Sequence, residues 1–201
     1  MSSLLRVLVV VAIGISGCSS GHDQPAGSAN APTPVVWQTL FDGTSLDGWG
    51  RIGDANWQIV DGAVQADMGT GFLLTNGVYE DFDLELEFWD TPDTNSGVFI
   101  RCANPAQIGA ATCYEVNIFD HRPDPAFRTG AIVGVAKPLV MLDTANRWNT
   151  YQVAAHGKHL LVKLNGQVTA DTEDDKFGAG PIALQYAAGR VMFRNVRIRP
   201  N

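Results

Sequence analysis

Apolar and polar residues alternate with a period of two through most of the chain from residue 37 onward. In segment 82–89, phenylalanine and leucine alternate with three acidic residues and a tryptophan. The same spacing recurs in segments 98–101, 114–119, 151–156, 160–165, 182–186 and 191–198. Period-two alternation indicates β-strands that place one face on a core and the other face elsewhere.

Turn signals separate these predicted strands. Asp61-Gly62 and Asn165-Gly166 are hairpin dipeptides, and His156-Gly157-Lys158 links two strands. No long stretch carries a clean helical stripe, so we expect an all-β domain, a two-sheet antiparallel β-sandwich or jelly roll. We also expect strands 82–89, 98–102 and 113–119 to be consecutive neighbours.

The N-terminus resembles an export signal. Arg6 precedes the apolar run Val7–Ile15, which is too short to span a bilayer but suits the apolar region of a signal peptide. Ile15-Ser16-Gly17-Cys18 resembles the bacterial lipoprotein signal, in which the cysteine is lipidated and becomes the first mature residue. The alternative is an ordinary signal peptide with a chance cysteine.

The expected organisation has three parts. Residues 1–17 are the predicted signal peptide, residues 18–36 the lipidated cysteine with a flexible linker, and residues 37–201 the folded domain. The linker is rich in Ser, Gly, Ala and Pro and offers too little apolar surface to fold. The protein is therefore expected to be exported and lipid-anchored in the bacterial cell envelope, with the membrane as a partner.

The net charge indicates which class of partner is excluded, and the cysteine content predicts a disulfide. The net charge of −7 and the pI near 4.9 argue against a nucleic-acid partner, which would select a basic surface. Cys102 ends one predicted strand and Cys113 opens the next. In an oxidising compartment this pair predicts a disulfide that closes the intervening loop.

Polar residues gather on the predicted non-core face of the middle strands. Arg101 lies on one strand, Glu115 and Asn117 lie on the next, and Asp120 follows. An arginine keeps a nearby carboxylate ionised, whereas a second carboxylate raises its neighbour's pKa. Such divergence lets carboxyl groups divide general-acid and general-base roles. Trp89 could add a platform for a sugar ring.

Several motifs, read in order, resemble the 3-keto-disaccharide hydrolase domain family from about residue 38 to residue 199. They are Phe41-Asp42-Gly43-Thr44-Ser45-Leu46-Asp47-Gly48-Trp49, Asn95-Ser96-Gly97-Val98-Phe99-Ile100-Arg101, Tyr114-Glu115-Val116-Asn117-Ile118-Phe119-Asp120, Trp148-Asn149-Thr150-Tyr151, Gly180-Pro181-Ile182-Ala183-Leu184-Gln185 and Phe193-Arg194-Asn195-Val196-Arg197-Ile198. The resemblance implies a concanavalin A-like sandwich that cleaves glycosides already oxidised to a ketone at sugar carbon 3.

The implied chemistry is proton abstraction from carbon 2, followed by elimination at carbon 1 and hydration. It requires a base, a group that stabilises the enolate and an acid for the leaving oxygen. Family members are thought to use a divalent metal for the enolate, which hard oxygen ligands would hold. No cofactor is otherwise implied, and the expected partner is an oxidised (3-keto) sugar or another carbohydrate.

The resemblance assigns roles residue by residue. Glu115 and Asp120 are the candidate base or metal ligands, and Arg101 would help to stabilise the enolate. The candidate substrate-binding residues are Asn95, Gln185, Trp89, Asn117 and Tyr186. Members often carry a histidine shortly after Leu184-Gln185, where this chain has Tyr186-Ala187-Ala188. His121 would then complete the site as a third possible ligand.

The main alternative is a non-catalytic, lectin-like carbohydrate-binding lipoprotein, because the same sandwich serves both purposes. A third alternative is that the protein is a structural or interaction domain of an envelope complex. Catalysis requires Glu115 and Asp120 to converge with Arg101 in a pocket, whereas a lectin would tolerate an open aromatic groove.

Replacing Cys18 by alanine tests the lipid anchor. The variant is expected to move from the detergent fraction to the aqueous fraction, because it lacks the thiol that would carry the lipid. Phase partitioning and the mass of the N-terminal peptide measure this. A wild-type protein found in the aqueous fraction with Ser2 or Ser3 at its N-terminus would contradict the prediction.

Overall fold

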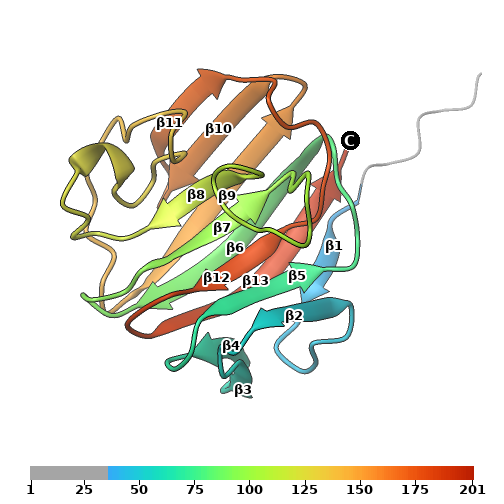
Figure 1. The fold of residues 1–201 in the computed structure, drawn as a ribbon, viewed down its shortest axis with the longest axis vertical. Coiled ribbons are helices and arrows are strands. Elements are labelled where there is room, and N and C mark those ends of the chain that lie inside the picture. Colours follow the sequence, from blue (N-terminus) through green and yellow to red (C-terminus); the bar gives the residue numbers. More distant parts are fainter. Residues whose placement is uncertain (1–35) are drawn as a thin grey trace, which may run out of the picture. The chain divides into compact units, whose positions relative to one another are not determined.

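The computed structural model describes residues 36–201, which form an all-β sandwich of an eight-stranded and a five-stranded antiparallel sheet (Figure 1). No helix in this described part is long and apolar enough to cross a membrane. The predicted signal peptide (1–17), the lipidation site Cys18 and the linker up to residue 35 lie outside the described residues and stay predictions.

The larger sheet has the order β11-β10-β9-β6-β13-β4-β3, and β1 also pairs with β13. Its strands are β1 (Gln38–Phe41), β3 (Gln58–Val60), β4 (Ala63–Ala66), β6 (Phe82–Asp90), β9 (Trp148–His156), β10 (His159–Leu164), β11 (Gln167–Glu173) and β13 (Val191–Pro200). The last strand of the chain, β13, therefore lies inside the sheet, between β6 on one side and β1 and β4 on the other.

The smaller sheet has the order β2-β5-β12-β7-β8. Its strands are β2 (Trp49–Gly53), β5 (Gly71–Thr75), β7 (Ser96–Ile100), β8 (Tyr114–Ile118) and β12 (Ala183–Tyr186). A short 3-10 helix, Pro125–Phe127, interrupts the long connection between β8 and β9.

Side chains alternate between the core and the outer face of the strands, as the period-two pattern predicts. In β6, burial alternates along the strand: Phe82, Leu84, Leu86 and Phe88 lie in the core, and the residues between them face outward. The predicted hairpin dipeptides also form turns, because Asp61 and Asn165 adopt left-handed φ angles of 49° and 51°, each followed by a left-handed glycine.

One predicted neighbour relation is wrong. β7 and β8 pair as expected, but β6 lies in the other sheet, between β9 and β13. Residues 91–95 carry the chain from one sheet to the other, and Thr91 and Thr94 both donate to the Arg190 carbonyl, Thr94 through Oγ1 at 2.8 Å. Alternation shows which face of a strand is buried but not which strand lies beside it.

The predicted disulfide between Cys102 and Cys113 is confirmed, with a Cα–Cα distance of 4.2 Å. It closes the loop between β7 and β8. Ile108 from this loop packs against the buried cluster of Phe99, Cys102, Cys113 and Ala183. The loop therefore covers part of the outer face of the smaller sheet.

Arg101 corrects the sequence prediction, because its side chain does not face outward with Phe99. Its φ of 52° ends the strand alternation directly after β7, and the residue is only 1% exposed. The guanidinium donates to the carbonyls of Glu80 and Gly157, each at 2.7 Å, and to Asp81 Oδ1 at 2.9 Å. It thereby joins the end of β7 to the start of β6 and to the β9–β10 turn.

Arg101→Ala is expected to lower the free energy of unfolding by more than about 3 kcal/mol, because it removes a buried charged donor from several acceptors. Arg190→Ala is the matched control: its side chain is half-exposed, so the loss should stay within about 0.5 kcal/mol. Chemical denaturation of the oxidised protein measures both. An Arg101 variant of normal stability that fails only in sugar cleavage would instead support a catalytic role.

Candidate functional site

The outer face of the five-stranded sheet combines apolar and polar side chains in two adjoining rows. In one row Glu115 of β8 lies opposite Phe99 of β7, and Ala183 and Leu74 continue it across β12 and β5. In the other row Asn117 lies opposite Gly97, and the register continues through Gln185 and Phe72. Phe72 and Phe99 meet edge to face, with ring centroids 5.4 Å apart.

Gly97 lies at the centre of these rows and is buried. A Cβ placed on Gly97 would lie 3.4 Å from the Phe99 ring and 3.5 Å from Glu115 Cγ, and 3.2 Å from the Val116 carbonyl oxygen. The absence of a side chain therefore lets the Glu115 side chain and the buried Phe99 ring pack closely over the Gly97 backbone. Glu115 itself is only partly buried, so a small ligand would meet its side chain from the solvent side.

Burial raises the pKa of the Glu115 carboxyl to about 7, and the nearby Arg122 guanidinium lowers it by a smaller amount. Within residues 36–201, the carboxyl accepts no hydrogen bond that would favour its charged form. Desolvation disfavours the charged form of a carboxyl group. Near neutral pH, Glu115 is thus divided between its acid and its carboxylate, which is the state that a general base or acid requires.

Two amide oxygens on the same sheet face as Glu115 lack partners. Gln185 Oε1 and Asn117 Oδ1 are buried without a hydrogen bond to any described residue. Asn117 uses its other amide atom to donate to the Phe127 carbonyl. A buried unpaired acceptor is costly, so both oxygens are suited to accept hydroxyl donors from a ligand.

The guanidinium of Arg122 is the nearby charge that lowers the pKa of Glu115. The sequence analysis did not identify this residue. Its guanidinium lies 5.6 Å from the centre of the Phe119 ring and 5.9 Å from that of Phe127, which holds it by cation–π contacts. Arg122 sits in the loop after β8, so strand periodicity gave no signal for it. Arg122 comes close to Glu115 because the loop folds back beside β8, where the backbone amide of Asn117 donates to the Ala131 carbonyl at 3.0 Å.

Asp120 does not face Glu115, which corrects the predicted pairing of the two carboxyls. It is 6% exposed and accepts from Thr129 Oγ1 at 2.5 Å and from the Thr144 amide at 2.6 Å. Thr144 Oγ1 lies between Asp120 and Asp90. Burial, and then the Asp120 charge, raise the pKa of Asp90 to about 7. Asp120 therefore holds the loop that carries Arg122.

The remaining predicted residues are divided among different places. Asn95 precedes β7 on the side of Gly97 and is half-buried. Tyr186 belongs to the core and donates its hydroxyl to the Gly189 carbonyl at 2.9 Å. Trp89 faces outward from the larger sheet, opposite Trp148. The expectation that Trp89 and Glu115 share a face is therefore wrong.

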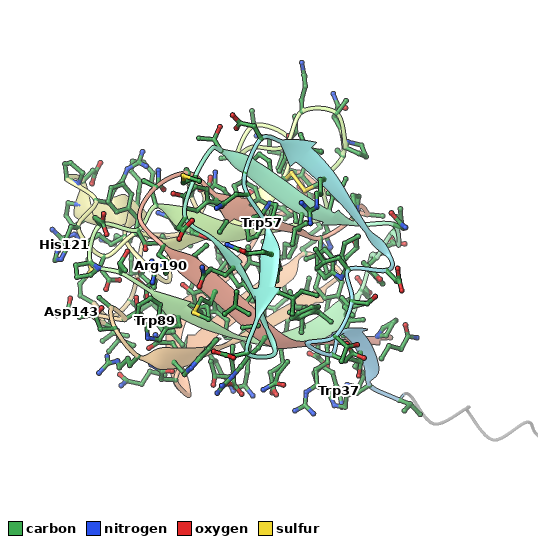
Figure 2. All side chains as sticks on the ribbon, turned by 90° about the horizontal axis from the view of Figure 1, so that it is seen from below. Trp37, Trp57, Trp89, His121, Asp143 and Arg190 are labelled. Atoms are coloured by element: carbon green, nitrogen blue, oxygen red, sulfur yellow. A yellow bond between two sulfur atoms is a disulfide. The ribbon has the colours of Figure 1, made fainter. Side chains whose placement is uncertain are left out.

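The side chains do not fit the implied divalent metal. His121 is exposed and lies with Asp143 at one end of the molecule (Figure 2). The Asp120 oxygens are occupied by threonine donors. Within residues 36–201, no three histidine, cysteine or acidic side chains come together as a metal site. The predicted set of Glu115, Asp120 and His121 thus does not assemble.

Comparison with solved structures shows the fold. Two glycosyl hydrolases from Parabacteroides distasonis, both named provisionally, match with TM-scores of 0.74 and 0.71 at 19% and 25% identity. The matches cover 82% and 83% of this chain and 94% and 100% of theirs. The carbohydrate-binding module CBM66 from Bacillus subtilis has a TM-score of 0.62 at 19% identity, over 76% of this chain and 95% of its own.

Among proteins of curated function, none matches this sequence. The family model of the 3-keto-α-glucoside-1,2-lyase-like domain matches residues 36–199. That range contains all of the strands except the last residue of β13, and every residue of the Glu115 face. The chain therefore belongs to the family of 3-keto-α-glucoside-1,2-lyase-like domains, and its function is carbohydrate-related.

Proposed function

We propose that this protein cleaves 3-keto-glycosides on the outer face of its five-stranded sheet, with Glu115 as the base. The observation that carries this proposal is a desolvated carboxyl with a pKa of about 7 on the same sheet face as the unpaired oxygens of Gln185 and Asn117. Membership in the family supports the substrate class. The export and lipid anchoring expected from Cys18 would place this reaction in the cell envelope.

One carboxylate can serve as the base in this reaction because the substrate's ketone activates the neighbouring C–H bond. A carbonyl at carbon 3 acidifies the hydrogen on carbon 2, and the Glu115 carboxylate removes that proton. The electron pair of the C2–H bond forms an enolate and then the C1–C2 double bond, while the bond from C1 to the aglycone oxygen breaks. The proton then held by Glu115 can pass to the leaving oxygen, and addition of water to the glycal completes a net hydrolysis.

Other side chains of this face suit the sugar. Gln185 Oε1 and Asn117 Oδ1 can accept hydroxyl protons, and Asn95 at the same edge can contact a further hydroxyl. Phe72, which is partly exposed and packs against the buried Phe99, offers apolar surface for the C–H face of the ring. The positive charge of Arg122 favours the enolate as it forms. Arg101, which is buried at another place, takes no part in this assignment.

A lectin-like role remains the alternative, because an open face with aromatic side chains can also bind a sugar without reacting. The raised pKa of Glu115 favours catalysis, since a binding site gains little from a carboxyl that is costly to ionise. The two functions give different outcomes in the experiment that follows.

Glu115→Gln is expected to lower kcat for 3-keto-glycoside cleavage by about 10²–10⁴-fold, the usual contribution of a general base. Wild-type kcat/KM should rise with pH through about 7 and then level off, because Glu115 must be deprotonated. Release of the aglycone from 3-keto-trehalose measures both. Glu173→Gln, an exposed position on β11, is the matched control. A Glu115 variant of full activity would exclude this base, and binding without cleavage by the wild type would establish the lectin.

Glu115→Gln should also change how stability depends on pH. In the wild type the folded-state pKa lies above the ordinary value of 4.5, so folding favours the protonated carboxyl. Stability is then highest below about pH 4.5, falls as pH rises to about 7 and stays constant above it. The glutamine variant lacks this loss and should gain melting temperature relative to the wild type at pH 8 but not at pH 4.

The melting temperatures of wild type, Glu115→Gln and Glu173→Gln across this pH range provide the check. Asp90 contributes a loss of the same sign to all three proteins, so the difference between variants isolates Glu115. An equal difference at both pH values would show that the Glu115 carboxyl is not desolvated.

A further inference from the structure

The outer face of the eight-stranded sheet carries a separate hollow of about 200 Å³, with Trp37 in its lining. Side chains from β6, β9, β10 and β13 surround it. The outward-facing members of its lining are Trp37, Asp83, Glu85, Gln152, Ala154, Leu161, Lys163 and Arg199. This face is the opposite side of the sandwich from Glu115, so the hollow is not part of the proposed catalytic site.

Strand register explains why the sheet is hollowed at this point. Ala154 of β9 lies opposite Asp83 of β6 on one side and opposite Leu161 of β10 on the other. Its methyl group is shorter than both neighbours and forms the floor. Gln152 lies between Glu85 and Lys163 in the adjoining row. The result is a short apolar floor with a polar row along its side.

Trp37, directly before β1, forms the rim of the hollow. Its ring lies 4.8 Å from the guanidinium carbon of Arg197 and 5.3 Å from that of Arg199. These cation–π contacts fix the indole beside the hollow and leave the tryptophan half-exposed. Figure 2 shows Trp37 at the opposite end of the molecule from His121 (Figure 2).

The polar groups around the hollow alternate between donors and acceptors. Arg199 Nε donates to Asp83 Oδ2 at 3.0 Å, and Gln152 Nε2 donates to Glu85 Oε2 at 3.0 Å. Lys163 forms no ion pair with any residue of the described chain. Asp83 pairs with Arg199, and Glu85 pairs with Arg197, which lies against Trp37. Both carboxylates are therefore neutralised by arginines, and Lys163 is left to donate to a hydroxyl.

We propose that this hollow binds one unit of a neutral glycan. A sugar ring presents an apolar C–H face, which suits the indole of Trp37, and an edge of hydroxyls that both donate and accept, which suits the paired carboxylates and Lys163. The volume is below the roughly 300–1,000 Å³ typical of sites for drug-sized ligands and fits a single ring. The site would hold a glycan on one face of the protein while the other face stays open.

This proposal does not depend on the reaction assigned to Glu115, and NMR can test it separately. The full chain with Cys18→Ala is labelled with ¹⁵N, and its five tryptophan indole signals are followed. Trp37→Phe identifies the Trp37 signal by its loss. Cellohexaose, maltohexaose and laminarihexaose are each added at millimolar concentration. At least one is expected to shift the Trp37 signal in a saturable manner.

Variants then locate the bound glycan. Trp37→Ala should weaken binding by at least about tenfold, the loss of an aromatic contact, and Ala154→Phe should do the same by filling the floor. Trp148→Ala removes a tryptophan from the same face outside the hollow and should leave affinity unchanged. Glu115→Gln should also leave affinity unchanged, and Trp37→Ala should leave 3-keto-trehalose cleavage unchanged.

Three outcomes would overturn the proposal. The first is the absence of a saturable Trp37 shift with all three oligosaccharides. The second is binding that survives both Trp37→Ala and Ala154→Phe, with melting curves showing that both variants are folded. The third is a shift abolished by Glu115→Gln, which would mean that the glycan occupies the Glu115 face.

Discussion

The buried guanidinium of Arg101 is the interaction on which this sandwich depends at one end. Two sheets packed face to face are held mainly by apolar contact, which sets their separation but only weakly their relative position. Arg101 adds directional bonds from the end of β7 to backbone carbonyls of Glu80 and Gly157 and to Asp81. Because a buried guanidinium without its acceptors is costly, these acceptors must stay in place for the fold to be stable.

Near the loop after β8, the buried side chain of Asp120 has a structural role similar to that of Arg101. Asp120 gathers donors from Thr129 and from Thr144, and so joins the end of β8 to two stretches of its long connection. That connection also carries Arg122 toward Glu115. The charged residues that first suggested catalysis are thus divided: Glu115 lies on the outer face of the smaller sheet, whereas Arg101 and Asp120 hold the framework around it.

The fold class was predictable because burial on one face imposes a period of two on each strand. The segments around β6 and β9, and the turns at Asp61 and Asn165, could be assigned from that pattern alone. The sheet partner of β6 could not, since partner choice depends on residues 91–95 crossing between layers. Trp89 was placed on the wrong face for the same reason. The direction of the Arg101 side chain could not be predicted, because a single left-handed φ angle turns it away from the outer face.

The site was predictable in part, for a related reason. Glu115, Asn117 and Gln185 lie on strands, so alternation and family motifs together place them outward. Arg122 lies on a loop whose path is set by tertiary contacts, and nothing in its local sequence distinguishes it from a solvated arginine. The Trp37 hollow depends on Ala154 being small beside longer neighbours on three other strands, which only the register reveals.

The position of β13 has a consequence for how the protein is made. This strand comes last in the chain, yet it joins β6 to β1 and β4 in the middle of the larger sheet. While the chain is still emerging from the ribosome or a translocation channel, β6 lacks one neighbour and β1 lacks its partner. Non-local pairing of this kind slows folding and exposes strand edges. The larger sheet therefore closes only after β13 has been made, and the strands that wait for it must be kept from aggregating until then.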